Sequence, residues 1–227
     1  MGKSLCTVGS KEQYTEYERR QMNRVGLILF GAVMITVCLV ASSFVARASA
    51  GVMTFKITPG TPNEVKFTSK APLETVVGKT DQISGTLSTD PDNIISSSAA
   101  QFEVQMATLR TGIGKRDSDM RNNHLHTDSI PTSSFTLESL EGISNGKLSN
   151  GSPVNFRAEG KFTLHGVTRN IEPDITAIWN AAEKSIKVTA RFKVLLQDYA
   201  IPRPQFLFMK LSEEQLVEIN FTAIASE

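Results

Sequence analysis

The chain has 227 residues, of which 40% are hydrophobic, so it can bury one sizeable core, in one domain or two small ones. Its 24 Lys and Arg and 23 Asp and Glu give a formal net charge of +1, which argues against a nucleic-acid-binding protein because that class carries a basic excess. The two cysteines, Cys6 and Cys38, both precede residue 50, so the rest of the chain folds without disulfide bonds or thiolate metal ligands.

The first fifty residues differ from the rest in charge and hydropathy. Residues 1–50 carry six Lys or Arg and three Asp or Glu, a net +3, whereas residues 51–227 carry eighteen and twenty, a net −2. Residues 25–46 contain no charged side chain, and as a helix they would span about 33 Å, the thickness of a bilayer core. Because more Arg residues precede this run than follow it, we expect residues 1–24 to be cytoplasmic and residues 51–227 to lie across the membrane.

The predicted membrane segment has two alternative fates. Its length favours a retained anchor, which would hold residues 51–227 at the periplasmic face of the inner membrane. Ala48, Ser49 and Ala50 look like a signal-peptide cleavage site, and cleavage after Ala50 would release a periplasmic or secreted protein. We expect export in either case, with the membrane as a partner through residues 25–46 if the anchor is retained.

Residues 51–227 alternate between apolar and polar side chains along most of their length. A period of two is typical of a β-strand with one buried face and one face in water. The apolar phases of six such runs are Val65 and Phe67; Phe102, Val104 and Met106; Phe135 and Leu137; Phe156, Ala158, Gly160, Phe162 and Leu164; Ile186, Val188, Ala190, Phe192 and Val194; and Val217, Ile219, Phe221, Ala223 and Ala225. We therefore predict an all-β, antiparallel domain.

Turn-forming residues separate these runs at residues 58–63, 90–93, 149–153 and 180–183. We predict about eight strands, and so many one-sided strands must either close into a barrel or pack as two layers. Gly160 and the His165-Gly166 step predict the sharp bends that barrel corners require. The pattern therefore favours a lipocalin-like barrel.

Two stretches break the period of two. Residues 115–127 place Met120, His124 and Leu125 at helical spacing, which predicts a short helix between strands. Residues 202–211, PRPQFLFMKL, are dense in large apolar groups, and we expect an irregular or helical segment there.

Motifs for catalysis and metal binding are sparse. The histidines His124 and His126 would point to opposite sides of a helix, and a zinc site would need a third ligand. His165 could act as a general base, but no G-x-S-x-G sequence and no cysteine nucleophile accompany it in residues 51–227. We therefore expect a protein that is not an enzyme and that carries no cofactor or metal.

Two segments carry a family resemblance. The first is LRTGIGKRD at residues 109–117, continuing through Leu125 to Phe135, and the second is GKFTLHGVTR at residues 160–169. Over residues 53–225 the chain resembles the YceI-like family of lipid- and polyisoprenoid-binding, lipocalin-like proteins. The resemblance implies a periplasmic or secreted barrel of about eight strands with a short helix over one end. It also implies a long apolar tunnel for an isoprenoid tail, such as that of a quinone-type lipid.

Alternation alone leaves open whether the interior is a tunnel or a core filled by its own side chains. Twelve phenylalanines against one tryptophan and three tyrosines indicate large apolar walls, and small inward residues such as Ala158 and Ala190 could leave an elongated void. With the resemblance, we predict non-catalytic binding of a long-chain apolar lipid. The predicted contacts are Phe67, Phe102, Val104, Met106, Phe135, Phe162, Leu164 and Phe192 along the tunnel, with Arg116, His165 and Arg169 at its polar end.

Two other functions remain open at this point. The domain could be an enzyme that acts on a lipid through His165, or a structural or interaction domain with a filled barrel. The oligomeric state is also open, a dimer included, because a closed barrel has no free edge that would force association.

Overall fold

The computed structural model describes residues 51–206 and 209–226, except residue 61. Residues 1–24 and 25–46 lie outside this range, so the cytoplasmic tail, the membrane segment and the domain boundaries stay predictions. Within the described residues, no helix is both long and apolar enough to cross a bilayer.

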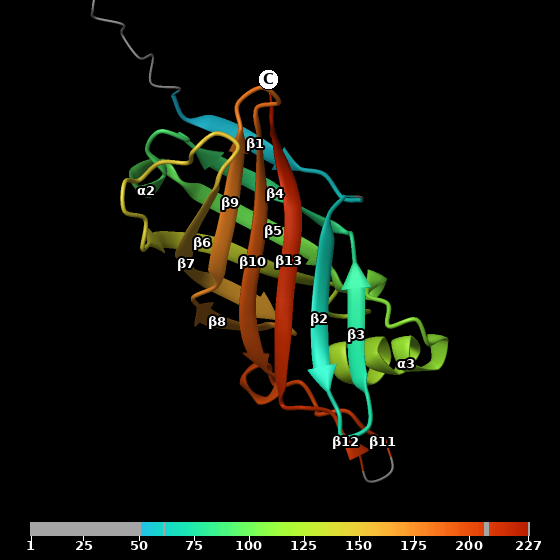
Figure 1. The fold of residues 1–227 in the computed structure, drawn as a ribbon. Coiled ribbons are helices and arrows are strands. Elements are labelled where there is room, and N and C mark those ends of the chain that lie inside the picture. The colour runs from blue at the N-terminus through green and yellow to red at the C-terminus, as the bar shows by residue number, and fades with distance from the viewer. Residues whose placement is uncertain (1–50, 61, 207–208, 227) are drawn as a thin grey trace, which may run out of the picture. The chain divides into compact units, whose positions relative to one another are not determined.

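Eight antiparallel strands form a closed ring (Figure 1). In order around the ring they are β1 (Met53–Ile57), β4 (Ile83–Thr89), β5 (Ala99–Gln105), β6 (Thr132–Glu141), β7 (Pro153–Leu164), β9 (Asp174–Asn180), β10 (Ser185–Leu195) and β13 (Glu214–Ala225). The ring closes where Phe55 of β1 pairs with Ala225 of β13. The predicted all-β, antiparallel barrel of about eight strands is confirmed.

The ring is complete over only part of its height. β13 pairs with β1 near residue 225, but over residues 215–220 it pairs with β2 (Glu64–Lys70), which in turn pairs with β3 (Thr75–Thr80). β7 likewise pairs with β9 over residues 153–157 but with β8 (Val167–Ile171) over residues 160–164. The barrel therefore has an upper section, which is the closed ring near the C-terminus, and a lower section, where the β2–β3 and β7–β8 hairpins form the walls.

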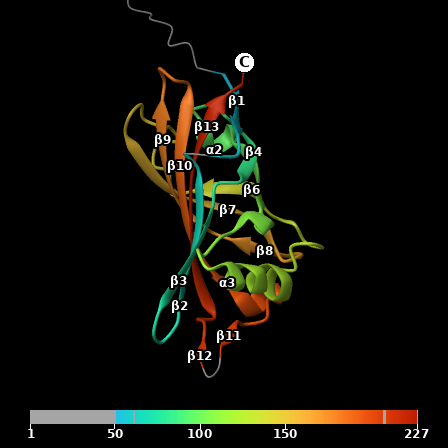
Figure 2. The same cartoon turned by 90° about the vertical axis from the view of Figure 1, so that its right-hand side faces the viewer.

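Short helices and a small hairpin gather at the lower end (Figure 2). α3 (Gly114–Asp119) runs directly into η3, a π-helix (Met120–Leu125), and the helix ends at His126, whose φ is 48°. The short helix predicted over residues 115–127 is confirmed. Of the other short helices, α2 (Ile94–Ser97) lies at the opposite, upper end (Figure 2), and the remaining two are η2 (Met106–Thr108) and η4 (Leu196–Tyr199).

The helical alternative for residues 202–211 is wrong. β11 (Gln205–Phe206) pairs with β12 (Met209–Lys210) in an antiparallel hairpin. This pairing satisfies backbone donors and acceptors without a helix, and phenylalanine favours strands over helices.

Gly160 and the His165-Gly166 step shape β7. A Cβ atom at Gly160 would lie 2.4 Å from the Thr136 carbonyl oxygen and 2.5 Å from the Phe135 ring, so only glycine leaves room for that ring. A β-bulge between Leu137 and Ser139 of β6 lies beside it. His165 and Gly166, with φ values of 50° and 75°, form the two-residue turn from β7 to β8. The predicted turn at His165-Gly166 is confirmed, whereas a bend of the strand at Gly160 stays a prediction.

The period of two in the sequence matches the burial of the strands. In β10, Ile186, Val188, Ala190 and Val194 are buried, while Lys187, Arg191 and Lys193 between them are exposed.

On the outer face of the sheet, Glu218 of β13 accepts hydrogen bonds from Lys66 of β2 at 2.8 Å and from Arg191 of β10 at 2.7 Å. The hydrogen bonds from Lys66 and Arg191 lower the pKa of Glu218 to about 2. This cross-strand cluster joins β2, β13 and β10 in the part of β13 that pairs with β2.

Candidate functional site

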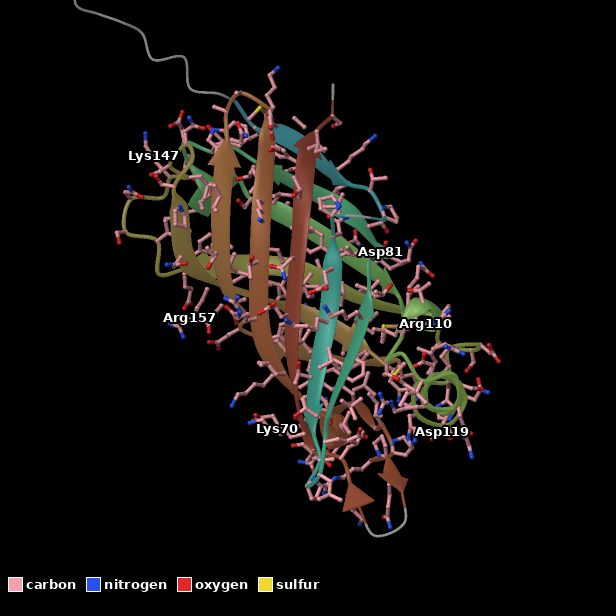
Figure 3. The ribbon with its side chains drawn as sticks, turned by 45° about the vertical axis from the view of Figure 1, so that its right-hand side comes forward. Lys70, Asp81, Arg110, Asp119, Lys147 and Arg157 are labelled. Atoms are coloured by element: carbon pink, nitrogen blue, oxygen red, sulfur yellow. The ribbon has the colours of Figure 1, made fainter. Side chains whose placement is uncertain are left out.

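A cavity of about 1060 Å³, here called the lower cavity, fills the lower section. Strands β2, β3, β10 and β13 and the ends of β5 and β7 form its walls, and α3, η3 and residues 201, 204, 205 and 211 lie around its mouth. Figure 3 shows Asp119 on the helix and Lys70 on β2 at this end, with Lys147 at the other end of the barrel. The apolar lining comprises Val65, Phe67, Ala71, Leu73, Val76, Val104, Met106, Leu109, Ile113, Met120, Leu125, Phe162, Leu164, Phe192, Val194, Leu196, Ile201, Pro204, Leu211, Val217 and Ile219.

A second, smaller cavity of about 120 Å³, the upper cavity, lies inside the closed ring. Its wall is almost wholly apolar, with Phe102, Phe135 and Phe221 among its largest side chains. The hydroxyls of Thr89 and Ser98 that border it hydrogen-bond to each other at 2.7 Å. Because these polar groups satisfy each other, the cavity suits a hydrocarbon group better than water.

The two cavities meet at a pair of aromatic rings. Val104, Ser133, Phe162, Phe192 and Ile219 line both cavities. The rings of Phe162 and Phe192 pack edge to face, with centroids 5.2 Å apart and an interplanar angle of 73°. The Ser133 hydroxyl donates to the Thr163 carbonyl oxygen at 2.8 Å, so it adds no free polar group. The cavities therefore adjoin at these five shared residues, and the Phe162–Phe192 pair supplies the two largest side chains of the boundary.

All eight apolar residues predicted to contact a ligand line one or both cavities. Phe67, Met106 and Leu164 line the lower cavity, Phe102 and Phe135 line the upper one, and Val104, Phe162 and Phe192 line both. Their position inside the barrel follows from the period of two. Their contact with a ligand stays a prediction.

Arg116 is the only one of the three predicted polar residues that lines a cavity. It lies at the mouth of the lower cavity, where its Nη1 pairs with Glu74 Oε1 at 3.2 Å and its Nε donates to Thr111 Oγ1 at 2.8 Å. Arg116 therefore ties α3 to the β2–β3 hairpin across the mouth.

The neighbouring Asp117 is buried and holds the start of the helix in place. Its Oδ1 accepts hydrogen bonds from the Thr111 backbone N–H at 2.7 Å and the Thr111 hydroxyl at 2.5 Å. Burial opposes ionisation, but these hydrogen bonds and the charges of Arg110 and Arg121 outweigh it and lower the pKa of Asp117. The carboxylate thus stays charged and fixes residues 111–117 beside the mouth.

His165 and Arg169 line neither cavity. His165 Nδ1 lies 3.0 Å from the Tyr199 carbonyl oxygen, and Arg169 Nε donates to the Asp198 carbonyl oxygen at 3.2 Å. Both side chains therefore join the β7–β8 hairpin to η4. A direct contact with the ligand at these residues stays a prediction.

The other two histidines also make structural contacts. His124 Nδ1 lies 2.8 Å from the Pro202 carbonyl oxygen, and His126 Nδ1 lies 2.8 Å from His165 Nε2. Among the described residues, no group of three His, Cys, Asp or Glu side chains has an arrangement that could hold a metal ion.

Several residues that line the lower cavity were not predicted from the sequence. Val76 and Leu109 are buried there, with exposures of 3% and 4%. The alternation of Val76, Gly78 and Thr80 in β3 was a usable signal for a strand. Leu196 begins η4 and Ile201 follows it, and no alternation in this stretch marks which side chains face inward.

The comparisons with known proteins agree with this architecture. The sequence model of the YceI-like domain matches residues 55–223, which confirms the resemblance. No curated protein matches the chain significantly. BcnA from Burkholderia cenocepacia superposes with a TM-score of 0.59 at 13% identity, over 70% of this chain and 95% of that one.

Two further solved structures share the fold. A polyisoprenoid binding domain from Saccharophagus degradans, implicated in plant cell wall breakdown, gives a TM-score of 0.59 at 16% identity, over 77% of this chain and 99% of that one. The YCEI protein of Campylobacter jejuni gives 0.56 at 18% identity, over 68% and 87%.

Proposed function

Since the chain belongs to the YceI-like family, we propose that its barrel binds a long-chain isoprenoid lipid and performs no reaction on it. The observation that carries this proposal is the lower cavity of about 1060 Å³, whose walls are lined mainly by apolar strand residues. The structurally similar domain from Saccharophagus degradans is described as polyisoprenoid binding, which supports this class of ligand.

The volume suits a long hydrocarbon chain. An apolar cavity of about 150 Å³ holds benzene, so at about 25 Å³ per carbon the lower cavity takes about 40 carbon atoms. Burying about 400 Å² of apolar ligand surface would contribute about 10 kcal/mol before the costs of association. Hydrophobic burial is therefore the main driving force for the proposed binding.

The charges at the mouth favour an uncharged head group. Arg116 pairs with Glu74 at 3.2 Å, and His124 Nε2 lies 3.5 Å from Asp119 Oδ2. Arg116 is therefore balanced by a carboxylate, whereas a diphosphate would require several unpaired cations. We therefore favour a quinone-type head group that accepts hydrogen bonds.

The contacts of His165 favour binding over catalysis. Its Nδ1 faces the Tyr199 carbonyl oxygen and its Nε2 faces His126, so both ring nitrogens are engaged away from the cavities. A general base must reach the proton that it abstracts, and His165 does not face the cavity where the ligand would lie.

We propose that the domain acts outside the cytoplasm, on the evidence of residues 25–46 in the sequence.

A titration with matched lipids tests this proposal. The full-length chain in detergent would be titrated with an isoprenoid quinone, with an isoprenyl diphosphate of equal chain length and with the quinone head group alone. We expect the quinone to bind most tightly, the diphosphate more weakly and the head group alone not measurably. Equal affinity for the head group alone would contradict a site driven by the tail. No binding of either isoprenoid would contradict the proposed function.

A further inference from the structure

The two cavities differ in the strands that enclose them, and the Phe162–Phe192 pair lies at the level where the enclosure changes. Residues 153–157 of β7 pair with β9, whereas Phe162 lies in the part that pairs with β8. On β10, pairing with β9 ends at Arg191, one residue before Phe192. The ring contact therefore lies at the floor of the closed section.

One ring of the pair is fixed and the other is less constrained. Phe162 is 9% exposed and packs edge to face on Tyr199 as well as on Phe192, with ring centroids 5.7 Å and 5.2 Å away. Phe192 is only partly buried, and within the described residues its one aromatic contact is Phe162. A hydrocarbon chain that rises from the mouth meets this pair before it reaches the upper cavity.

Resting on the proposed function, we propose that Phe162 and Phe192 form a stop that sets the longest isoprenoid chain the barrel accepts. In the wild-type chain, the tail ends below the pair and the upper cavity stays unfilled by ligand, so Phe102 and Phe135, which line only that cavity, make no contact with the tail. At about 25 Å³ per carbon, the upper cavity of about 120 Å³ has room for about five carbon atoms, which is one isoprene unit. Opening the stop therefore lengthens the preferred chain by about one unit.

The test compares two identical exchanges at buried or partly buried rings. Phe192→Leu shortens the stop, whereas Phe55→Leu makes the same exchange at a ring that lines neither cavity and packs on Trp179. Each full-length protein in detergent would be offered an equimolar ladder of polyprenols that differ by one isoprene unit. Native mass spectrometry would then measure the distribution of bound lengths.

We expect Phe192→Leu to shift the most populated length upward by about one isoprene unit, while Phe55→Leu keeps the wild-type distribution. An unchanged distribution in Phe192→Leu would overturn the stop, and so would a folded Phe192→Leu protein that binds no polyprenol. If Phe192→Leu does not fold, Phe162→Leu opens the same contact from the other side and carries the same expectation. Failure of the wild-type chain to bind any polyprenol would instead contradict the proposed function.

Discussion

The imidazole Nδ1 of His165 lies 3.0 Å from the carbonyl oxygen of Tyr199. A carbonyl oxygen only accepts hydrogen bonds, so Nδ1 carries the proton and Nε2 is the acceptor in the neutral ring. His126 Nδ1, 2.8 Å from that Nε2, is then the donor. Among the described strands, β8 pairs only with β7. The contact between His165 and Tyr199 therefore joins the β7–β8 hairpin to η4, and this junction is here called the seam.

Replacing His165 by alanine should weaken this seam and lower the free energy of unfolding. The Tyr199 carbonyl would lose its imidazole donor, at a cost of about 1 kcal/mol in the free energy of unfolding. Hydrogen exchange of residues 196–201 should become faster. His126→Ala removes only the outer, exposed partner and should change both quantities less. Equal effects of the two changes would contradict a seam held by His165.

A charge in the cavity wall should remove the ligand. Phe162→Asp places a carboxylate where both cavities are apolar, and burying an unpaired charge costs several kcal/mol. Asn170→Asp places the same group on the exposed outer face of the neighbouring β8, opposite Lys161. We expect lipid in organic extracts of the Asn170→Asp protein and none in those of Phe162→Asp, with circular dichroism confirming the fold. Equal lipid in both folded proteins would count against the proposed lining.

The close approach at Gly160 should make it intolerant of any side chain. In Gly160→Ala, the new Cβ would collide with the Thr136 carbonyl oxygen and the Phe135 ring. Overpacking of this kind costs about 1–3 kcal/mol, and urea denaturation should show a lower midpoint with an unchanged slope. Gly114→Ala is the control, because nothing lies within 4 Å of its Cβ position. Equal stability of the two variants would show that β7 and β6 separate easily.

The Glu218 cluster should make stability depend on pH in acid. The pKa of Glu218 is about 2 in the folded state against 4.5 for the free side chain, so its contribution is fully present above about pH 4.5 and is lost as the pH falls through about 2. With solvent screening, Glu218→Gln should cost about 1 kcal/mol near pH 7.

Urea denaturation of the wild type and Glu218→Gln across this range measures the difference, which should shrink as the pH falls. Glu214→Gln removes a carboxylate with one exposed partner, Lys193, and should show little pH dependence. A constant difference between wild type and Glu218→Gln would contradict the low pKa.

The sequence predicted the strands of the barrel well because their burial is one-sided. Ile186, Val188 and Val194 show this alternation directly, and the sheet buries the face that the pattern indicates. The residues at the mouth were harder to predict. Arg116 was identified through the family motif, but its pairing with Glu74 depends on contact between segments 42 residues apart.

The contacts between the β7–β8 hairpin and η4 could not be predicted because the acceptor atoms belong to the backbone of η4. His165 and Arg169 donate to carbonyl oxygens of η4, and carbonyl groups carry no sequence signal. The division of the ring into two sections escaped prediction for a related reason. The alternation of β13 continues unchanged while its partner changes from β2 to β1.

The identity of the lipid that the full-length chain carries tests the central claim most directly. The protein would be purified from its membrane fraction and its soluble fraction, and organic extracts would be analysed by mass spectrometry. We predict one isoprenoid molecule per protein chain, with about 40 carbon atoms of its tail inside the lower cavity. Extracts that contain only bulk phospholipid, from a folded protein that also binds no added isoprenoid, would contradict it.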